Sequence, residues 1–194
     1  VGPDGNLWFT EAAGNKIGTI TPAGVITEHA LTGTPQPGEI AAGPDGALWF
    51  TEYQANKIGR AAIDGTITET ALATGADPIG IASGPDGALW FTESGTNAIG
   101  RMTTAGQLTE YSTGQVAPYG IVAGPDGALW FTEFCGTAIG RITTTGVITT
   151  TAVPSGGSCP NGAAGPGSTA GIALGPDGAI WFVEQGNNKI ARLQ

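Results

Sequence analysis

Basic residues and histidine are scarce in this chain of 194 residues, which has seven Lys and Arg side chains and one histidine. All seven basic residues fall within one recurring segment, which reads NKIGR in its fullest form. No separate positive patch remains to neutralise phosphates, as nucleic-acid binding would require. The composition therefore argues against nucleic acid as a partner.

Long apolar runs are also missing, and no run approaches the length needed to cross a bilayer. No charged-then-apolar leader precedes the first repeat, so we expect a soluble chain without a membrane span. The sequence begins at Val1 in the middle of a repeat, which is compatible with a removed leader or a longer parent chain.

Glycine is abundant instead, with 34 residues, and one ten-residue phrase occurs five times. It reads GPDGALWFTE in its commonest form and starts at residues 2, 43, 84, 124 and 175, at spacings of 41, 41, 40 and 51. A period near forty residues, with an aromatic core followed by short apolar runs, is typical of a β-propeller of four-stranded blades. We predict an all-β fold in which residues 1–194 form one propeller repeat array.

The second repeat shows how one blade is built. Asp45 lies in a Pro-Asp-Gly sequence that predicts a tight turn, because Pro presets φ and Gly accepts a positive φ. Around it, four segments have the small, aromatic or β-branched residues of strands, at residues 40–43, 48–51, 57–60 and 66–69.

Applied to the whole chain, this pattern predicts blades of three, four, four, four and three strands, which is about four and a half blades. The first repeat lacks its inner strand and the last lacks its outer strand, so the two ends do not complement each other. We expect a longer parent protein, or association with a partner chain, to complete the ring.

The repeat unit itself accounts for most of the net charge of −9, since ten of the sixteen acidic residues are its Asp and Glu. The repeated glutamates close the second strand of each unit, and a ring of them, with Glu52, Glu93 and Glu133 as candidates, could hold a divalent cation through oxygen ligands. The alternative is structural: a residue present in every blade satisfies backbone groups or pairs with the lysine of the next strand.

Positions that break the repeat are better candidates for function. Glu39, Asp77 and Tyr119 each occur once, at the start of an inner strand, and could line a shallow polar pocket. The alternatives are that Tyr119 covers the packed channel and that Asp77, which precedes Pro78, shapes a turn. The lone His29 lies on a predicted outer strand, where we expect it at the rim or in packing.

The two cysteines are a further departure from the repeat. Cys135 follows the fourth repeat phrase, and Cys159 lies in the ten-residue excess before the last one. Both loops should emerge on the same face of the propeller, which predicts a disulfide worth about 3 kcal/mol in the chain-entropy model. A disulfide implies an oxidising compartment, hence an extracellular or cell-surface location. The alternative is two free thiols in a cytosolic protein.

The phrases GPDGxLWFTE and NKIGRI, a Gly turn, an ITEY-like strand and PxGIA together resemble the virginiamycin B lyase (streptogramin lyase) family. The likeness covers nearly the whole chain. It implies a seven-bladed propeller of about 290 residues, of which this chain would be roughly two thirds. It also implies a carbon–oxygen lyase that opens a cyclic depsipeptide by elimination, with a His as general acid or base and Mg²⁺ near acidic residues at the mouth.

In that family the catalytic histidine follows Pro at the start of an inner strand. The corresponding slots of this sequence hold Gly38, Ile79, Tyr119 and Ala170, and none is histidine. We therefore predict a non-catalytic scaffold that binds a small molecule, peptide or partner at the propeller face, with no cofactor evident from its residues. The alternative is a Mg²⁺-dependent lyase whose histidine lies outside this segment, and a lactonase-like hydrolase is a third hypothesis.

Overall fold

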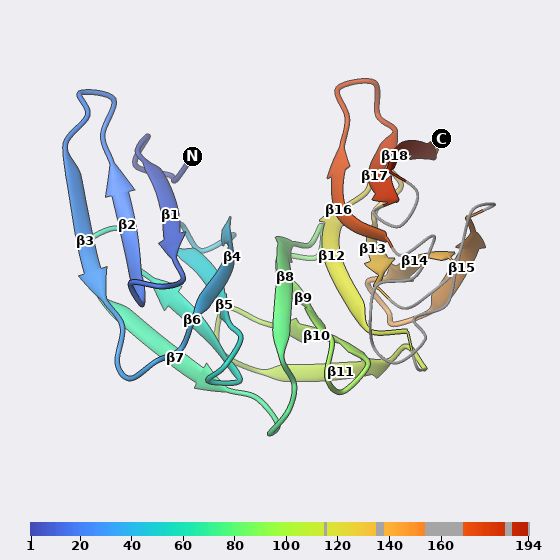
Figure 1. The fold of residues 1–194 in the computed structure, drawn as a ribbon, viewed down its shortest axis with the longest axis horizontal. Helices are drawn as coiled ribbons and strands as arrows, with labels where there is room; N and C mark the ends of the chain where they lie inside the picture. The colour runs from blue at the N-terminus through green and yellow to red at the C-terminus, as the bar shows by residue number, and fades with distance from the viewer. Residues whose placement is uncertain (115, 135–137, 154–168, 185–187, 194) are drawn as a thin grey trace.

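The computed structural model describes residues 1–114, 116–134, 138–153, 169–184 and 188–193. These residues form five antiparallel sheets with three, four, four, four and three strands. Figure 1 shows the sheets following one another around an open arc, from blade 1 in blue to blade 5 in red. The predicted all-β propeller is confirmed, and so is the number of strands in each of the five blades.

Within each blade, consecutive strands are neighbours in the sheet. Blade 1 has β1 (Leu7–Glu11), β2 (Lys16–Ile20) and β3 (Ile26–Ala30); blade 2 has β4 (Pro37–Ala42), β5 (Leu48–Glu52), β6 (Lys57–Ala61) and β7 (Ile67–Ala71); blade 3 has β8 (Pro78–Ser83), β9 (Leu89–Glu93), β10 (Ala98–Met102) and β11 (Leu108–Ser112). Blade 4 has β12 (Pro118–Ala123), β13 (Ala128–Glu133), β14 (Ala138–Thr143) and β15 (Ile148–Ala152); blade 5 has β16 (Thr169–Leu174), β17 (Ile180–Glu184) and β18 (Lys189–Leu193).

The inner strands β4, β8, β12 and β16 lie side by side, and each begins earlier than the sequence predicts. In blade 2 the strand starts at Pro37 rather than at Ile40. The pairing passes from Pro37↔Glu52 to Ile40↔Phe50, so two residues of β4 bulge out of register. The bulge lets the inner strand continue to the end of the propeller at which the inner strands begin, and it redirects the bulged residues toward the axis.

The core lies between the blades. The Trp49 face of blade 2 packs against Leu89 and Phe91 of blade 3, and the next interface repeats this arrangement. Gly59 makes the close approach of the Phe50 ring to its own sheet feasible, because a Cβ at Gly59 would lie 2.2 Å from ring carbons. Aromatic and aliphatic burial between blades therefore supplies most of the stabilisation.

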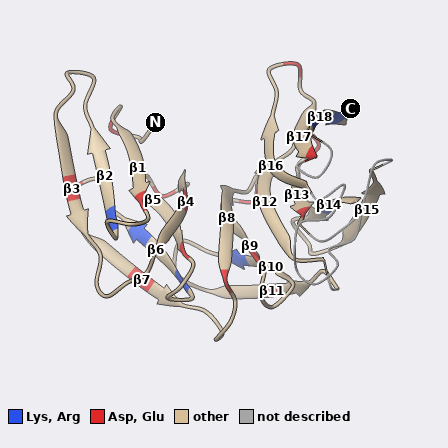
Figure 2. Ribbon diagram, in the orientation of Figure 1, with Lys and Arg blue, Asp and Glu red and all other residues tan. Residues whose placement is uncertain are grey.

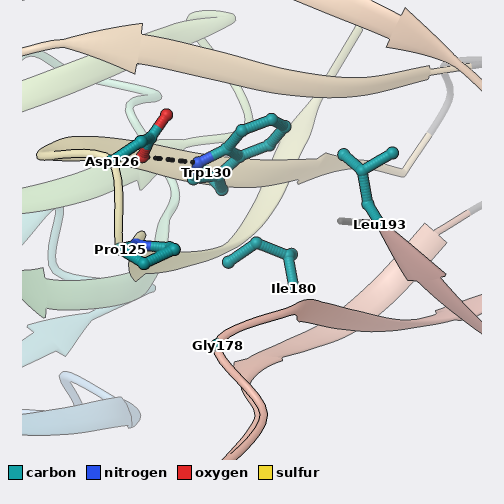
Figure 3. A pocket seen from close by; sticks show the side chains of 6 residues that line it. All are labelled: Pro125, Asp126, Trp130, Gly178, Ile180 and Leu193. Carbon is teal, nitrogen blue, oxygen red and sulfur yellow. Dashed lines mark hydrogen bonds between the residues drawn. The ribbon is translucent and has the colours of Figure 1, made fainter.

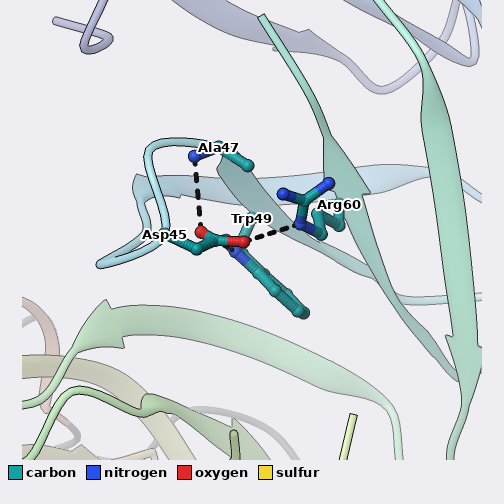
Figure 4. A network of polar contacts seen from close by, with 4 residues as sticks. All are labelled: Asp45, Ala47, Trp49 and Arg60. Atoms are coloured by element: carbon teal, nitrogen blue, oxygen red, sulfur yellow. Dashed lines mark hydrogen bonds and ion pairs between the residues drawn. The ribbon is translucent and has the colours of Figure 1, made fainter. Parts of the chain in front are cut away.

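The Asp of each turn anchors the Trp of the strand that follows it. Asp45 accepts hydrogen bonds from Trp49 Nε1 at 3.0 Å, from the Ala47 N–H at 3.3 Å, and from Arg60 Nε at 2.7 Å (Figure 4). Burial acts to raise the pKa of Asp45, but these hydrogen bonds outweigh it and lower the pKa below its usual range. The repeated Asp, Trp and Arg are therefore parts of the scaffold.

Charged residues are spread over several blades along the chain (Figure 2). In the part of the chain that the structure describes, no helix is long and apolar enough to cross a membrane.

Candidate ligand-binding site

The inner strands of blades 2, 3 and 4 begin at the same end of the propeller, which we call the mouth. Each is preceded by a residue held at positive φ by the preceding blade. Asp77 has φ of 48°, and its N–H donates to Asn56 Oδ1 at 3.0 Å. Gln36 and Ala117 repeat this arrangement with Asn15 and Asn97. The Asn of each blade thus fixes the entry to the next inner strand.

An apolar groove lies at the mouth across blades 1 to 4. It consists of two adjoining cavities of about 380 and about 350 Å³. Tyr53, Ile79 and Tyr119 line both cavities. The lining of the first also includes Ala12, Pro37 and Pro78, and that of the second includes Asp77 and Phe134. We call this surface the mouth groove. Its size and its largely apolar walls suit a small organic ligand.

Two aromatic rings from blade 4 form one wall of the mouth groove. Tyr119 stacks on Phe134 with ring centroids 5.6 Å apart and an interplanar angle of 25°. Tyr53 approaches from blade 2 and is 41% exposed. The sequence analysis missed Tyr53 and Phe134, although each is an aromatic residue directly after a repeated Glu, a position that is not aromatic in the other three repeats. The rule that singled out Tyr119, a break in the repeat at the mouth, would have found both.

Buried threonines hold the inner strands that carry these side chains. Thr92 Oγ1 accepts a hydrogen bond from the Gly80 N–H at 2.9 Å and donates one to the Tyr119 carbonyl at 2.6 Å. Thr51 makes the equivalent bonds to the Glu39 N–H and the Ile79 carbonyl, at 3.1 and 2.8 Å. One hydroxyl therefore joins the bulge in the inner strand of its own blade to the residue that follows Pro in the inner strand of the next blade.

The three asymmetric residues do not all meet. Tyr119 and Asp77 both line the second cavity of the mouth groove. Glu39, although exposed as a residue, directs its carboxylate toward β8, where Oε2 accepts from the Ile81 N–H at 3.3 Å. Desolvation there raises the pKa of Glu39, and this hydrogen bond partly offsets the rise. Glu39 lines neither cavity of the groove.

The repeated glutamates end the second strands beside the inner-strand starts, as Pro37↔Glu52 and Pro78↔Glu93 pairing shows. Their side chains are buried, with 0% exposure for Glu52 and Glu93 and 3% for Glu133. Burial raises the pKa of all three to about 7. Lys57 pairs with Glu69 rather than with Glu52, both of whose carboxylate oxygens lack a hydrogen-bond partner.

These glutamates do not fit a shared magnesium site. Each lies on a different blade, and the described residues contain no group of three or more His, Cys, Asp or Glu that could hold a metal ion. A ring of carboxylates around one Mg²⁺ would need the three side chains to converge. No chemical step of this chain is therefore assigned to Mg²⁺ held by Glu52, Glu93 and Glu133.

His29 lies on β3 and takes part in packing. Its ring stacks on Trp8 at 6.0 Å with an interplanar angle of 13°, and a Cβ on Gly65 of blade 2 would lie 2.3 Å from it. The lone histidine therefore belongs to the interface of blades 1 and 2 and not to the mouth groove.

A smaller cavity of about 150 Å³ opens at the opposite end of the propeller, between blades 4 and 5 (Figure 3). Its lining includes Pro125, Asp126 and Trp130 of blade 4, with Ile180 and Leu193 of blade 5. Trp130 Nε1 donates to Asp126 Oδ1 at 3.1 Å, as in the other blades. Because its walls are repeat residues in their structural roles, we place the functional site at the mouth groove.

Cys135 and Cys159 lie outside the described residues, so their disulfide stays a prediction.

Comparison with known proteins agrees with this geometry. The family model of the virginiamycin B lyase family matches residues 1–194. The chain belongs to the virginiamycin B lyase family. A comparison with curated proteins found no match.

Solved members of the virginiamycin B lyase family share the fold. The selenomethionine-substituted virginiamycin B lyase of Staphylococcus aureus is 45% identical, with a TM-score of 0.91 over 100% of this chain and 64% of that one. A streptogramin B lyase is 41% identical, with a TM-score of 0.87 over 100% of this chain and 66% of that one. The S. aureus enzyme was also solved as a catalytically inactive variant with quinupristin, at the same identity, TM-score and coverage. The chain thus spans less than two thirds of the S. aureus enzyme.

Proposed function

We propose that this chain is a ligand-binding propeller that takes a cyclic depsipeptide of the streptogramin B class into the mouth groove, without lyase chemistry by its own residues. The observation that carries the proposal is the residue at the position after Pro at the start of the inner strand of blade 4. There Tyr119, stacked on Phe134, stands where the family resemblance calls for a catalytic histidine in an active blade.

The groove supplies the physical basis for binding. Its cavities of about 380 and about 350 Å³ are each within the usual range for small-molecule sites. Aromatic rings from two blades offer large apolar area at low conformational cost, and a cyclic peptide arrives already restricted in shape. Asp77 adds one carboxylate that can accept hydrogen bonds from ligand amides or an ammonium group. The solved relative with quinupristin supports this ligand class.

A lyase remains the second candidate function, because the chain spans 64% of the S. aureus enzyme. A parent protein with further blades could provide a histidine and Mg²⁺ beside the mouth groove. In that case the residues of this chain would bind and orient the depsipeptide, and the other blades would carry the proton transfer.

The first experiment is isothermal titration of the purified protein with quinupristin, followed by chromatography and mass spectrometry of the recovered ligand. We expect saturable binding and recovery of the intact ring. Elimination would give a linear product of unchanged mass and a new retention time, and hydrolysis would add one water. Either product would overturn the non-catalytic assignment, and the absence of binding would overturn the ligand assignment.

We also propose that the protein works in an oxidising compartment outside the cytoplasm, with Cys135 and Cys159 joined. This rests on the sequence positions of the two cysteines, with Cys135 just after the fourth repeat phrase and Cys159 in the ten-residue excess before the last one. Such a disulfide would close a loop of 24 residues and tether the segment between β15 and β16.

A further inference from the structure

Blade 2 places an ammonium group beside two carboxylates on one face of its sheet. Glu52 lies opposite Lys57, and Gly59 lies opposite Glu69, so all of these positions share a face. Lys57 Nζ donates to Glu69 Oε2 at 2.5 Å, and its charge acts to lower the pKa of the buried Glu52. Blade 1 has the same three residue types, with Lys16 bound to Glu28.

Blade 3 keeps both carboxylates of this arrangement and loses the lysine. Glu93 lies opposite Ala98, and Gly100 lies opposite Glu110, in the register that blade 2 uses for Glu52, Lys57, Gly59 and Glu69. Ala98 is buried, with 7% exposure, and cannot supply a charge. In blade 4 the outer-strand position is Thr150, so the second carboxylate is missing there. Among the described blades, the pair of carboxylates without lysine occurs in blade 3.

The Glu93 side chain points toward the place that the lysine side chain takes in blade 2. Its carboxylate is fully buried, and Oε2 accepts a hydrogen bond from Thr96 Oγ1 at 2.8 Å. Oε1 accepts no hydrogen bond from a donor, and the Glu110 carboxyl lies within hydrogen-bonding reach of the Glu93 carboxyl. A Cβ on Gly100 would lie 2.9 Å from Oε1, so this oxygen reaches across β10 at the level of Glu110. Two neighbouring carboxyl groups, one of them fully buried, need a positive or proton-donating group between them.

We propose that Glu93 and Glu110 bind a divalent cation, Ca²⁺ or Mg²⁺, in the position that the Lys57 ammonium takes in blade 2. Two carboxylates carry the charge that such an ion neutralises, and hard cations prefer oxygen ligands. Glu110 is exposed, so water can complete the coordination. With two protein side chains as ligands, the site is expected to bind in the range of about 10⁻⁴ to 10⁻³ M.

Protons compete with the ion for the same pair. Burial, together with the charge of Glu110, raises the pKa of Glu93 to about 7. On the facing blade 2, Trp49 and Ile58 pack against this side of blade 3. The charged groups on that side are Arg60, which is paired with Asp45, and Asp77, whose Oδ2 lies near Gly95.

The test compares melting temperatures of the EDTA-treated, dialysed protein at pH 8 in CaCl₂, in MgCl₂ and in NaCl of equal ionic strength. At ten times the dissociation constant, a specific divalent ion should raise the melting temperature by about 3–6 °C over NaCl. The variant Ala98→Lys restores the residue of blade 2, and should melt higher than the wild type in NaCl while losing the divalent shift. Glu110→Gln, at an exposed outer-strand position, should also lose the shift.

Ala138→Lys is the matched control, since it adds a lysine at the equivalent position of blade 4, where no second carboxylate follows. It should keep the full divalent shift of the wild type. The proposal is overturned if the wild type shows no divalent shift, or if Glu110→Gln retains it. Because ligand binding at the mouth groove is not measured, the outcome is independent of the proposed function.

Discussion

The hydroxyl of Thr92 donates a hydrogen bond of 2.6 Å to the carbonyl oxygen of Tyr119, and thereby ties blade 3 to the strand that carries one wall of the mouth groove. Thr132 makes the same link from blade 4 to Ala170 of blade 5 at 2.7 Å. Blade 5 has Val183 at this position, which has no hydroxyl to offer. From blade 2 to blade 5, each pair of neighbouring blades is thus joined at the mouth by one threonine hydroxyl, in addition to the apolar packing between them.

Replacing Thr92 by Val should lower the free energy of unfolding by about 1–3 kcal/mol, because the Gly80 N–H and the Tyr119 carbonyl would be left buried without this partner. Thr92→Ser keeps the hydroxyl and should retain most of the stability. Urea-induced unfolding followed by Trp fluorescence measures both. A Val variant as stable as the wild type, with the loss confined to the Ser variant, would show that the methyl group, and not the hydrogen bonds, matters.

Tyr119→Ala should weaken quinupristin binding about tenfold, which corresponds to about 1.4 kcal/mol for the loss of one aromatic contact. Tyr111→Phe is the matched control, because Tyr111 stacks on Trp90 inside the interface of blades 3 and 4, away from the groove. Isothermal titration gives both affinities. Unchanged affinity in Tyr119→Ala would move the ligand away from the mouth groove.

Gly59→Ala should cost about 1–3 kcal/mol of stability, since the added Cβ would lie 2.2 Å from the buried Phe50 ring. Gly171→Ala provides a contrast, because its Cβ would first meet Val183 at 3.8 Å. That change should stay within about 0.5 kcal/mol. Thermal unfolding measures the stability of both variants. A Gly59→Ala protein as stable as the Gly171→Ala protein would mean that the Phe50 ring moves aside without cost.

The protein should become more stable as the pH falls from 8 to 5. Burial raises the pKa of Glu133 to about 7 from an ordinary value of 4.5, and Glu52 and Glu93 are raised to about 7 as well. Between these values the folded state holds protons that the unfolded state has released, so stability falls as the pH rises from about 5 to about 7 and changes little above that. The melting temperature across this range measures the effect.

Glu133→Gln isolates one contribution to that pH dependence, because Ala138 lies near it on β14 and no carboxylate follows on β15. This variant should melt higher than the wild type at pH 8 and show a smaller rise on acidification. An identical pH dependence in wild type and variant would exclude Glu133 as a source.

Cys135 and Cys159 should resist alkylation in the oxidised, unfolded protein and each take one label after reduction. Intact mass before and after treatment counts the labels, with Cys135→Ser as the variant that leaves one free thiol. Two labels without reduction would rule out the disulfide and, with it, the argument for an oxidising compartment.

The repeat by itself determined the architecture. A phrase of constant content and spacing predicts strands at constant places, because alternation, turn residues and aromatic burial are local properties that each repeat carries in full. The strand count of each described blade and the turn at Asp45 followed from this reasoning. For His29 it left a place at the rim or in packing open, and the structure shows the packing. The starts of the inner strands did not, since a bulge adds residues without changing the pattern.

Only the tertiary structure decided which non-repeated residues meet. The mouth groove joins Tyr53 of blade 2 to Tyr119 and Phe134 of blade 4, and it leaves out Glu39, because the curvature of the array brings some loops together and turns others toward the axis. Likewise the sequence could not tell that Lys57 binds Glu69 rather than Glu52. Such contacts depend on side-chain direction and on the twist between blades, which residue type and spacing do not encode.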